Sequence, residues 1–326
     1  MNRREFLKNS ALASALLAAY GLQPARAQER QTYYMVTFLS RLDYWVDCYR
    51  GMLDAATYLG VEAIYTGTPE HDVDAEIQVL EETAALEPDG ILMTVLQGDP
   101  LRAPIDSVVD SGINVVTFDA DSPLSKRASF VGTGNYAAGV VAARYLGPLV
   151  QSGRVAITTA SGQGNLELRA AGFRDTLAAE FPDIVTDDSL IVDNEGDSAI
   201  GATKLMELLQ TESDIRGIFG TNAQSAVSIG YALRQTGMTE QVHSIGFDYD
   251  VNTLNLIDNG ELGATLAQGT WQMGFWGMLF LYMVRNGHIK SVADWQSAGI
   301  SPLPPNVDTG VVVITRENSQ FWRSSE

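Results

Sequence analysis

The sequence predicts an α/β fold made of two doubly wound parallel sheets. Short apolar runs alternate with longer helical patterns along nearly the whole chain. The short runs are continuously apolar rather than alternating, which is typical of parallel strands covered by helices on both faces. Strand–helix alternation also implies right-handed crossovers within each sheet. With 326 residues, the chain is long enough for two medium domains.

The expected elements follow one another in a regular order. The strands are expected at 33–38, 61–65, 90–94, 114–118, 154–159, 217–220, 242–247 and 263–267. The helices are expected at 44–59, 74–86, 101–111, 136–151, 166–180, 198–210, 223–236, 251–259 and 271–286. The series divides near 130–135 and restarts at 154, which favours two sheets over one. A proline-rich connection, 297–305, then leads to a last strand at 311–315.

The first 27 residues have the pattern of a secretory signal. Arg3 and Arg4 form a basic head, 11–19 is a short apolar run, and 24–27 (PARA) is a small-residue cleavage site. The paired arginines before Phe6 are typical of the twin-arginine subtype of signal. The apolar run is far shorter than the ~20 residues that span a bilayer. The sequence therefore predicts cleavage after Ala27 and a location in the periplasm.

Composition excludes several classes of function. The formal net charge of −19 disfavours nucleic acid and anionic lipid as partners. Cys48 is the single cysteine, so no internal disulfide and no thiolate metal cluster can form. The three histidines are scattered without metal-ligand spacing. We therefore expect no metal and no cofactor.

Polar or aromatic residues follow nearly every expected strand, at the edge where open parallel sheets bind ligands. In chain order, the candidates are Tyr44, Trp45, Asp119, Arg169, Asn222, Asp248 and Gln268. Asp and Asn are also common helix caps, so each of them alone has a structural explanation. Together the set supplies carboxylates and amides for hydroxyls, an arginine fork, and an exposed aromatic pair, Tyr44 and Trp45. It predicts a site for a polyhydroxylated ligand such as a sugar or sugar alcohol.

Motifs for catalysis are weak. The segment 132–139 (GTGNYAAG) approaches a dinucleotide-binding turn, but its last glycine is one residue late. The segment from Asp248 begins like a calcium loop, but Thr253 and Asn259 stand where glycine and glutamate are needed. Asp119 and Asp248 could form a glycosidase pair, although no pattern around them indicates that one is kept protonated. We therefore expect a binding protein rather than an enzyme.

Five short motifs occur in a family-specific order: 131–139 (VGTGNYAAG), 169–173 (RAAGF), 219–222 (FGTN), 245–248 (IGFD) and 265–268 (TLAQ). With the closing segment 307–313 (VDTGVVV), they resemble periplasmic sugar-binding proteins of the ribose-binding type, which serve bacterial ABC importers. The resemblance implies a type I periplasmic binding protein fold, in which two lobes joined by three hinge crossings hold the sugar in a cleft.

The resemblance also implies a division of the chain. Lobe one is expected at 31–133 plus 269–296, and lobe two at 134–268 plus 297–326. The crossings are expected near Thr133, Gln268 and Ser297.

Family binding residues carry over onto matching positions of this sequence. Tyr44 and Trp45 match stacking aromatics, and the hydroxyl-binding groups match Asp119, Arg169, Asn222, Asp248 and Gln268. Three positions depart from the family pattern. Ala120 replaces an arginine, Val95-Leu96 replace a polar-proline pair for which Gln97 is expected to substitute, and Gly196 stands where an aromatic closes over the sugar. These departures disfavour ribose and favour a larger, differently oriented or acyclic ligand.

The expected partners are a small-molecule sugar or polyol and an ABC permease in the inner membrane. The family resemblance implies a monomer. An alternative role is a sensing subunit that presents the same fold to a histidine kinase or chemoreceptor. A secreted hydrolase is a third hypothesis. The residues at the strand ends do not separate transport from sensing.

Overall fold

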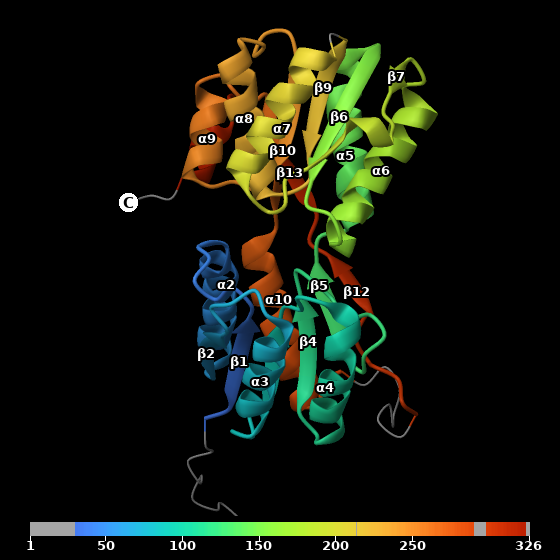
Figure 1. Cartoon of the computed structure of the whole chain (residues 1–326). Helices are drawn as coiled ribbons and strands as arrows, with labels where there is room; N and C mark the ends of the chain where they lie inside the picture. Colours follow the sequence, from blue (N-terminus) through green and yellow to red (C-terminus); the bar gives the residue numbers. More distant parts are fainter. Residues whose placement is uncertain (1–29, 213, 290–297, 324–326) are drawn as a thin grey trace, which may run out of the picture.

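Two α/β lobes, each built around its own sheet, make up this computed structural model, which describes residues 30–212, 214–289 and 298–323 (Figure 1). The predicted fold class is therefore confirmed. The predicted signal, 1–27, lies outside the described residues. Across the three described ranges, no helix combines the length and the apolar character needed to cross a membrane.

The first sheet has six parallel strands in the order β12-β5-β4-β3-β1-β2. Its strands are β1 (Thr32–Thr37), β2 (Glu62–Gly67), β3 (Gly90–Met93), β4 (Asn114–Phe118), β5 (Ser129–Gly132) and β12 (Asn306–Asp308). The helices packed on it are α2 (Tyr44–Leu59), α3 (Val73–Ala84), α4 (Gly98–Asp110) and α10 (Thr270–Arg285). α10 thus joins this lobe although it follows β11 of the other lobe in the chain (Figure 1).

The second sheet runs β13-β11-β10-β9-β6-β7, with β8 also paired to β6. Its strands are β6 (Gly153–Thr159), β7 (Ile184–Val185), β8 (Ile191–Asp193), β9 (Ile215–Gly220), β10 (His243–Phe247), β11 (Ala264–Gln268) and β13 (Val311–Ile314). The helices of this lobe are α5 (Asn135–Val150), α6 (Gly164–Glu180), α7 (Ser198–Thr211), α8 (Ala223–Thr236) and α9 (Val251–Asp258), with 3₁₀ turns at Asp188–Leu190 and Ser319–Trp322. All pairs are parallel except β11–β13.

Apolar cores cover both faces of each sheet, as the continuously apolar strands predict. In the first lobe, one core includes Met35, Trp45 and Leu281 on the α2/α10 side, and another includes Leu80, Ile91 and Leu101 on the α3/α4 side. The α2 and α10 backbones lie so close that a Cβ on Gly274 would stand 1.8 Å from the carbonyl oxygen of Cys48. Only glycine permits that approach.

Three crossings join the lobes, and hydrogen bonds connect them to one another. The first crossing follows β5, the second follows β11, and the third lies between β12 and β13 (Figure 1). The Thr133 hydroxyl donates to Gln268 Oε1 at 2.6 Å, which links the first two. The Gly134 N–H donates to Asp308 Oδ1 at 2.7 Å, which links the first and third. The crossings therefore form one connected hinge.

The expected domain division is wrong at the tail. Residues 306–308 form β12 and pair with β5 in the first sheet, so they do not belong to the second lobe. The Ser129 hydroxyl also donates to the carbonyl of Pro304, which ties the preceding residues to the same sheet. The chain instead crosses at 309–310, between β12 and β13. Ser297, the expected third crossing, lies outside the described residues.

Four short strands were missed by the sequence prediction: β5, β7, β8 and β12. They contain two to four residues each, below the length at which hydrophobic periodicity is informative. The nine expected strands all correspond to strands of the structure within a few residues.

Candidate functional site

Asp119 and Asp248 occupy matching positions in the two lobes. Each follows a phenylalanine at the carboxyl end of a strand, Asp119 after β4 and Asp248 after β10. Both have left-handed backbone conformations, with φ of 62° and 64°. Asp adopts this conformation more readily than most residues, yet it still costs of order 1–3 kcal/mol. The same strained turn therefore presents one half-buried carboxylate from each lobe.

Arg169, on α6, is the buried cation of the site, with 2% of its surface exposed. Its Nε donates to Asn135 Oδ1 at 2.8 Å, its Nη1 to the Thr221 carbonyl at 2.8 Å, and its Nη2 to Gln268 Oε1 at 3.0 Å. The guanidinium also lies 3.7 Å from the centre of the Phe247 ring. A planar fork held by three acceptors and a ring has little freedom, so its orientation is set before any ligand arrives.

Gln268, at the end of β11, connects the hinge to the site. Its Oε1 accepts from both Arg169 and the Thr133 hydroxyl, and its Nε2 donates to Asp248 Oδ1 at 2.6 Å. The side chain is 6% exposed. Since Thr133 and Gln268 belong to two crossings, a hinge rotation would change the geometry around Arg169 and Asp248 directly.

Tyr44 brings the first lobe to the same place. It is the first residue of α2, and its hydroxyl donates to Asp119 Oδ1 at 2.7 Å. Burial raises the pKa of Tyr44 well above its usual value, and the charges of Asp119 and Asp248 add to that rise. The charge of Asp248, in the second lobe, thus acts on a group of the first lobe.

Burial and charge set the protonation of the site. Burial raises the pKa of Asp248 to about 6, against the Arg169 charge and the Gln268 hydrogen bond, which lower it. Burial also raises the pKa of Asp119, opposed by Tyr44 and Arg169. Burial lowers the pKa of Arg169, and both carboxylates oppose that change. No sequence pattern predicts these shifts, which come from desolvation in the folded protein.

Trp45 does not form an exposed aromatic pair with Tyr44, so that expectation is wrong. It is 3% exposed, its indole N–H donates to the Phe38 carbonyl at 3.0 Å, and its ring packs edge-on against Phe38, Tyr44 and Phe118. An aromatic residue one position after Tyr44 on a helix points in a different direction, here into the core. Trp45 therefore packs against the Tyr44 ring from the core side.

Asn222 and Gln97 begin helices. Asn222 caps α8, because its Oδ1 accepts from the Ser225 N–H at 2.9 Å, and Asn194 donates to the same oxygen at 3.2 Å. Within the described chain, no hydrogen bond uses its Nδ2. Gln97 precedes α4 and is exposed, and it shares no side-chain hydrogen bond with the other candidates among the described residues. The helix-cap explanation thus holds for the oxygen of Asn222 and leaves its amide N–H groups available to a ligand.

The sequence does not predict that Thr133, Asn135 and Asn194 support the site, although Thr133 is expected at a crossing and Thr133 and Asn135 lie in the 131–139 motif. Thr133 and Asn135 follow β5, one of the strands that the pattern did not reveal. Asn194 is fully buried after β8, another missed strand. Inspecting the residues that follow every strand would have indicated the supporting role of all three, had the short strands been recognised.

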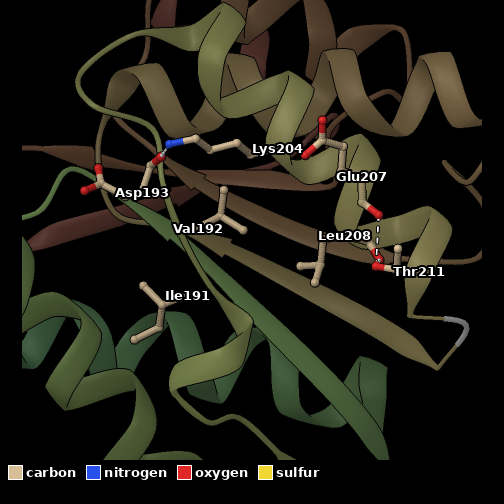
Figure 2. Close-up of a pocket in the computed structure, with 7 residues that line it drawn as sticks. All are labelled: Ile191, Val192, Asp193, Lys204, Glu207, Leu208 and Thr211. Carbon is tan, nitrogen blue, oxygen red and sulfur yellow. Dashed lines mark hydrogen bonds between the residues drawn. The ribbon is translucent and has the colours of Figure 1, made fainter.

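A surface pocket elsewhere on the second lobe contains none of the candidates. Figure 2 shows that it is lined by Ile191, Val192, Asp193, Lys204, Glu207, Leu208 and Thr211, from β8 and α7. Lys204 is already engaged, since its Nζ donates to the Asp193 carbonyl at 2.8 Å and to Glu195 at 2.6 Å. The single cation that lines this pocket is therefore already bound by neighbouring groups of the protein.

Two lobes that present paired carboxylates around one fixed arginine define a bilobal ligand-binding protein. The periplasmic binding protein domain matches residues 33–289 of this sequence, and the chain belongs to that family. One curated relative is the xylose/arabinose-binding protein of Sulfolobus acidocaldarius, 24% identical over 297 residues, which cover 85% of this chain and 69% of the relative.

Two solved structures are more similar. A sugar-binding protein of a sugar ABC transporter from Bacillus halodurans is 38% identical with a TM-score of 0.86, covering 90% of this chain and 100% of that one. An arabinose-binding protein from Geobacillus stearothermophilus is 36% identical with a TM-score of 0.83 and the same coverage. The likeness extends over both lobes.

Proposed function

We propose that the protein binds a sugar between its two lobes and delivers it to an ABC importer. One observation carries the proposal: Asp119 and Asp248 stand at matching strand ends of opposite lobes, and the charge of the buried Arg169 guanidinium lowers the pKa of both carboxyls. A ligand that bonds to both carboxylates holds the lobes together. Such a ligand needs donors on two sides, as a sugar ring has.

The surrounding groups fit hydroxyls rather than a charged ligand. Asp119 and Asp248 are acceptors, and the N–H groups of Arg169, Asn222 and Gln268 are donors. Hydroxyl groups both donate and accept, so each can bridge a carboxylate and a nitrogen donor. Two carboxylates and one buried arginine leave one net negative charge, which disfavours an anionic ligand. Tyr44 adds an aromatic ring whose face suits the C–H groups of a sugar.

We infer that the ligand is a pentose, with arabinose the first candidate. The relatives from Sulfolobus and Geobacillus are named for xylose or arabinose. Hexoses, sugar alcohols and inositols are the competing ligands. A sugar alcohol has no sugar ring, so it lacks the C–H face that would pack on the aromatic ring of Tyr44. It is therefore the weaker candidate.

Binding in this proposal involves closure and no covalent step. A ligand with micromolar affinity yields about −8 kcal/mol. Hydrogen bonds to the charged groups are worth about 1.5–3 kcal/mol each, and the excess is offset by desolvation and by ordering the lobes. The hinge links Thr133–Gln268 and Gly134–Asp308 provide the connected axis about which the lobes would close.

The partner is a membrane permease that recognises the closed form, and the place of action is the periplasm. The twin-arginine leader that the sequence predicts would export an already folded chain. The protein would act as a monomer, since the ligand contacts come from the two lobes of one chain.

A thermal-shift screen tests the proposal. The purified protein is screened against D- and L-arabinose, xylose, ribose, common hexoses, sugar alcohols and inositols. A specific ligand at 100 times its dissociation constant stabilises the protein by about 2.7 kcal/mol. We expect one pentose to give the largest shift. Equal, negligible shifts across the whole panel would contradict the proposal.

Matched variants assign the site. Asp119→Asn and Asp248→Asn remove a charge while keeping a residue that tolerates the left-handed backbone. We expect each to abolish most of the ligand-induced shift while the unliganded protein stays folded. Glu87→Gln is the control, because Glu87 also has a left-handed conformation (φ 51°) but is exposed, in the turn that follows α3. Unchanged ligand affinity in both Asn variants would remove the site assignment.

A further inference from the structure

Glu76 is a buried acidic residue outside the site described above. It lies in the first turn of α3, and its side chain is 0% exposed. Glutamate is almost never fully buried unless a positive group is paired with it. Within the described ranges, Glu76 forms no ion pair, and no charged side chain influences its pKa. Its burial therefore calls for another explanation.

The Glu76 carboxyl contacts the turn that leads toward the site. Its Oε2 accepts a hydrogen bond from the Leu96 N–H at 3.0 Å. Leu96 lies between the end of β3 at Met93 and the start of α4 at Gly98. The same turn contains Gln97, whose side chain is exposed at the carboxyl end of β3. The Glu76 carboxyl thus accepts a hydrogen bond from the backbone of the turn that contains Gln97.

The carboxyl is suited to this role in its neutral form. Burial raises the pKa of Glu76 to about 8, although the Leu96 hydrogen bond lowers it. A protonated carboxyl keeps a carbonyl oxygen that can accept from Leu96. Its other oxygen, Oε1, has no partner among the described residues, and neither has the buried hydroxyl of Thr94 two residues before Leu96. An ionised carboxylate here would have no compensating cation among the residues that the structure describes.

We propose that Glu76 is a positioning residue for the ligand site, holding Leu96 and thereby fixing the β3–α4 turn that presents Gln97 to the sugar. This inference rests on the proposed function and on the prediction from the sequence that Gln97 contacts the ligand. It assigns Glu76 no contact with the ligand. Its effect passes through the backbone of the turn, since a binding group must be held in place by the residues behind it.

Two substitutions separate the hydrogen bond from the volume of the side chain. Glu76→Gln keeps an acceptor oxygen and the shape, and Glu76→Met keeps the volume but removes the acceptor. With the pentose that binds best, we expect Glu76→Gln to keep the dissociation constant within about twofold of wild type. We expect Glu76→Met to raise it about five- to tenfold, because the turn and Gln97 lose their fixed position.

A double-mutant cycle with Gln97→Ala tests the route. If Glu76 acts through Gln97, the double variant Glu76→Met/Gln97→Ala binds about as weakly as Gln97→Ala alone. Leu80→Ala, one turn further along α3, is the structural control. It opens a cavity in the core against which the same helix packs, and it removes no hydrogen bond to the turn. We therefore expect a lower free energy of unfolding and an unchanged dissociation constant for the sugar.

A readout without ligand keeps this inference distinct from the proposed function. Hydrogen exchange of the Leu96 amide is expected to be slow in wild type and Glu76→Gln and much faster in Glu76→Met. If no sugar binds wild-type protein, the proposed function fails, and the exchange of Leu96 still decides whether Glu76 holds the turn. Equal exchange in the two variants, or wild-type affinity in Glu76→Met, would overturn the inference.

Discussion

Replacing Arg169 with methionine is the most informative test of how the site is held together. The change removes the buried charge and keeps a side chain of comparable length. It deletes hydrogen bonds to Asn135, Thr221 and Gln268 and the contact with the Phe247 ring. It also leaves two partly buried carboxylates without their cation. Removing one partner of a buried ionic group costs about 3–5 kcal/mol of unfolding free energy, and we expect that loss near neutral pH.

The loss depends on pH in a defined direction. In wild type, Arg169 opposes the burial that raises the pKa of Asp248 to about 6. Without Arg169, that pKa rises further. A carboxyl whose pKa is higher in the folded protein than in the unfolded chain lowers the free energy of unfolding once the pH exceeds the unfolded-state pKa. Below the unfolded-state pKa it has no such effect. The deficit of Arg169→Met is therefore expected to grow as the pH rises above about 6, where Asp248 ionises in wild type, and to be smaller below that pH.

Urea unfolding, followed by circular dichroism at several pH values, measures this effect. Arg144→Met is the control, since Arg144 pairs with Glu180 on the exposed surface. We expect the control to unfold like wild type. The reasoning is refuted if Arg169→Met is no less stable than the control, or if its deficit is the same at every pH.

Three further results are expected. Glu76→Gln is expected to raise the free energy of unfolding by about 3 kcal/mol at pH 7 and by under about 1 kcal/mol at pH 5, because the raised pKa of Glu76 costs stability above its unfolded value. A difference between the urea midpoints of variant and wild type that stays the same at both pH values would contradict this. Gly274→Ala lowers the melting temperature sharply through its clash with the α2 backbone, whereas Gly164→Ala, with open space, does not. Cys48 is fully buried, so it is expected to react with a thiol reagent only after denaturant is added. Rapid labelling of the native protein would contradict the burial of Cys48.

The fold was largely predictable because its strands are apolar on both faces. Runs such as 114–118 and 263–267 can be buried only in a sheet covered by helices on both sides. The short strands were not predictable in the same way. β12, at Asn306–Asp308, is mostly exposed and pairs with β5 through backbone hydrogen bonds, more than 170 residues away in sequence. Its place depends on the long-range fold, so the third crossing was misplaced.

The strand-end rule found the polar groups but not their protonation or support. Asp119, Asp248 and Gln268 are identified by following directly after apolar runs. Desolvation by the rest of the fold raises the pKa of Asp248, and no local pattern reports it. Trp45 was selected by the same rule, but its side chain lies in the core. An aromatic residue at the start of a helix can face the ligand or the core, and only packing against Phe118 and its neighbours decides.

Isothermal titration calorimetry with arabinose is the most direct test of the central claim that a sugar is held between Asp119 and Asp248. The account predicts saturable one-to-one binding by the wild-type protein, and a loss of at least tenfold in affinity for Asp119→Asn and for Asp248→Asn. No heat from any pentose, or the same affinity in all three proteins, would contradict it.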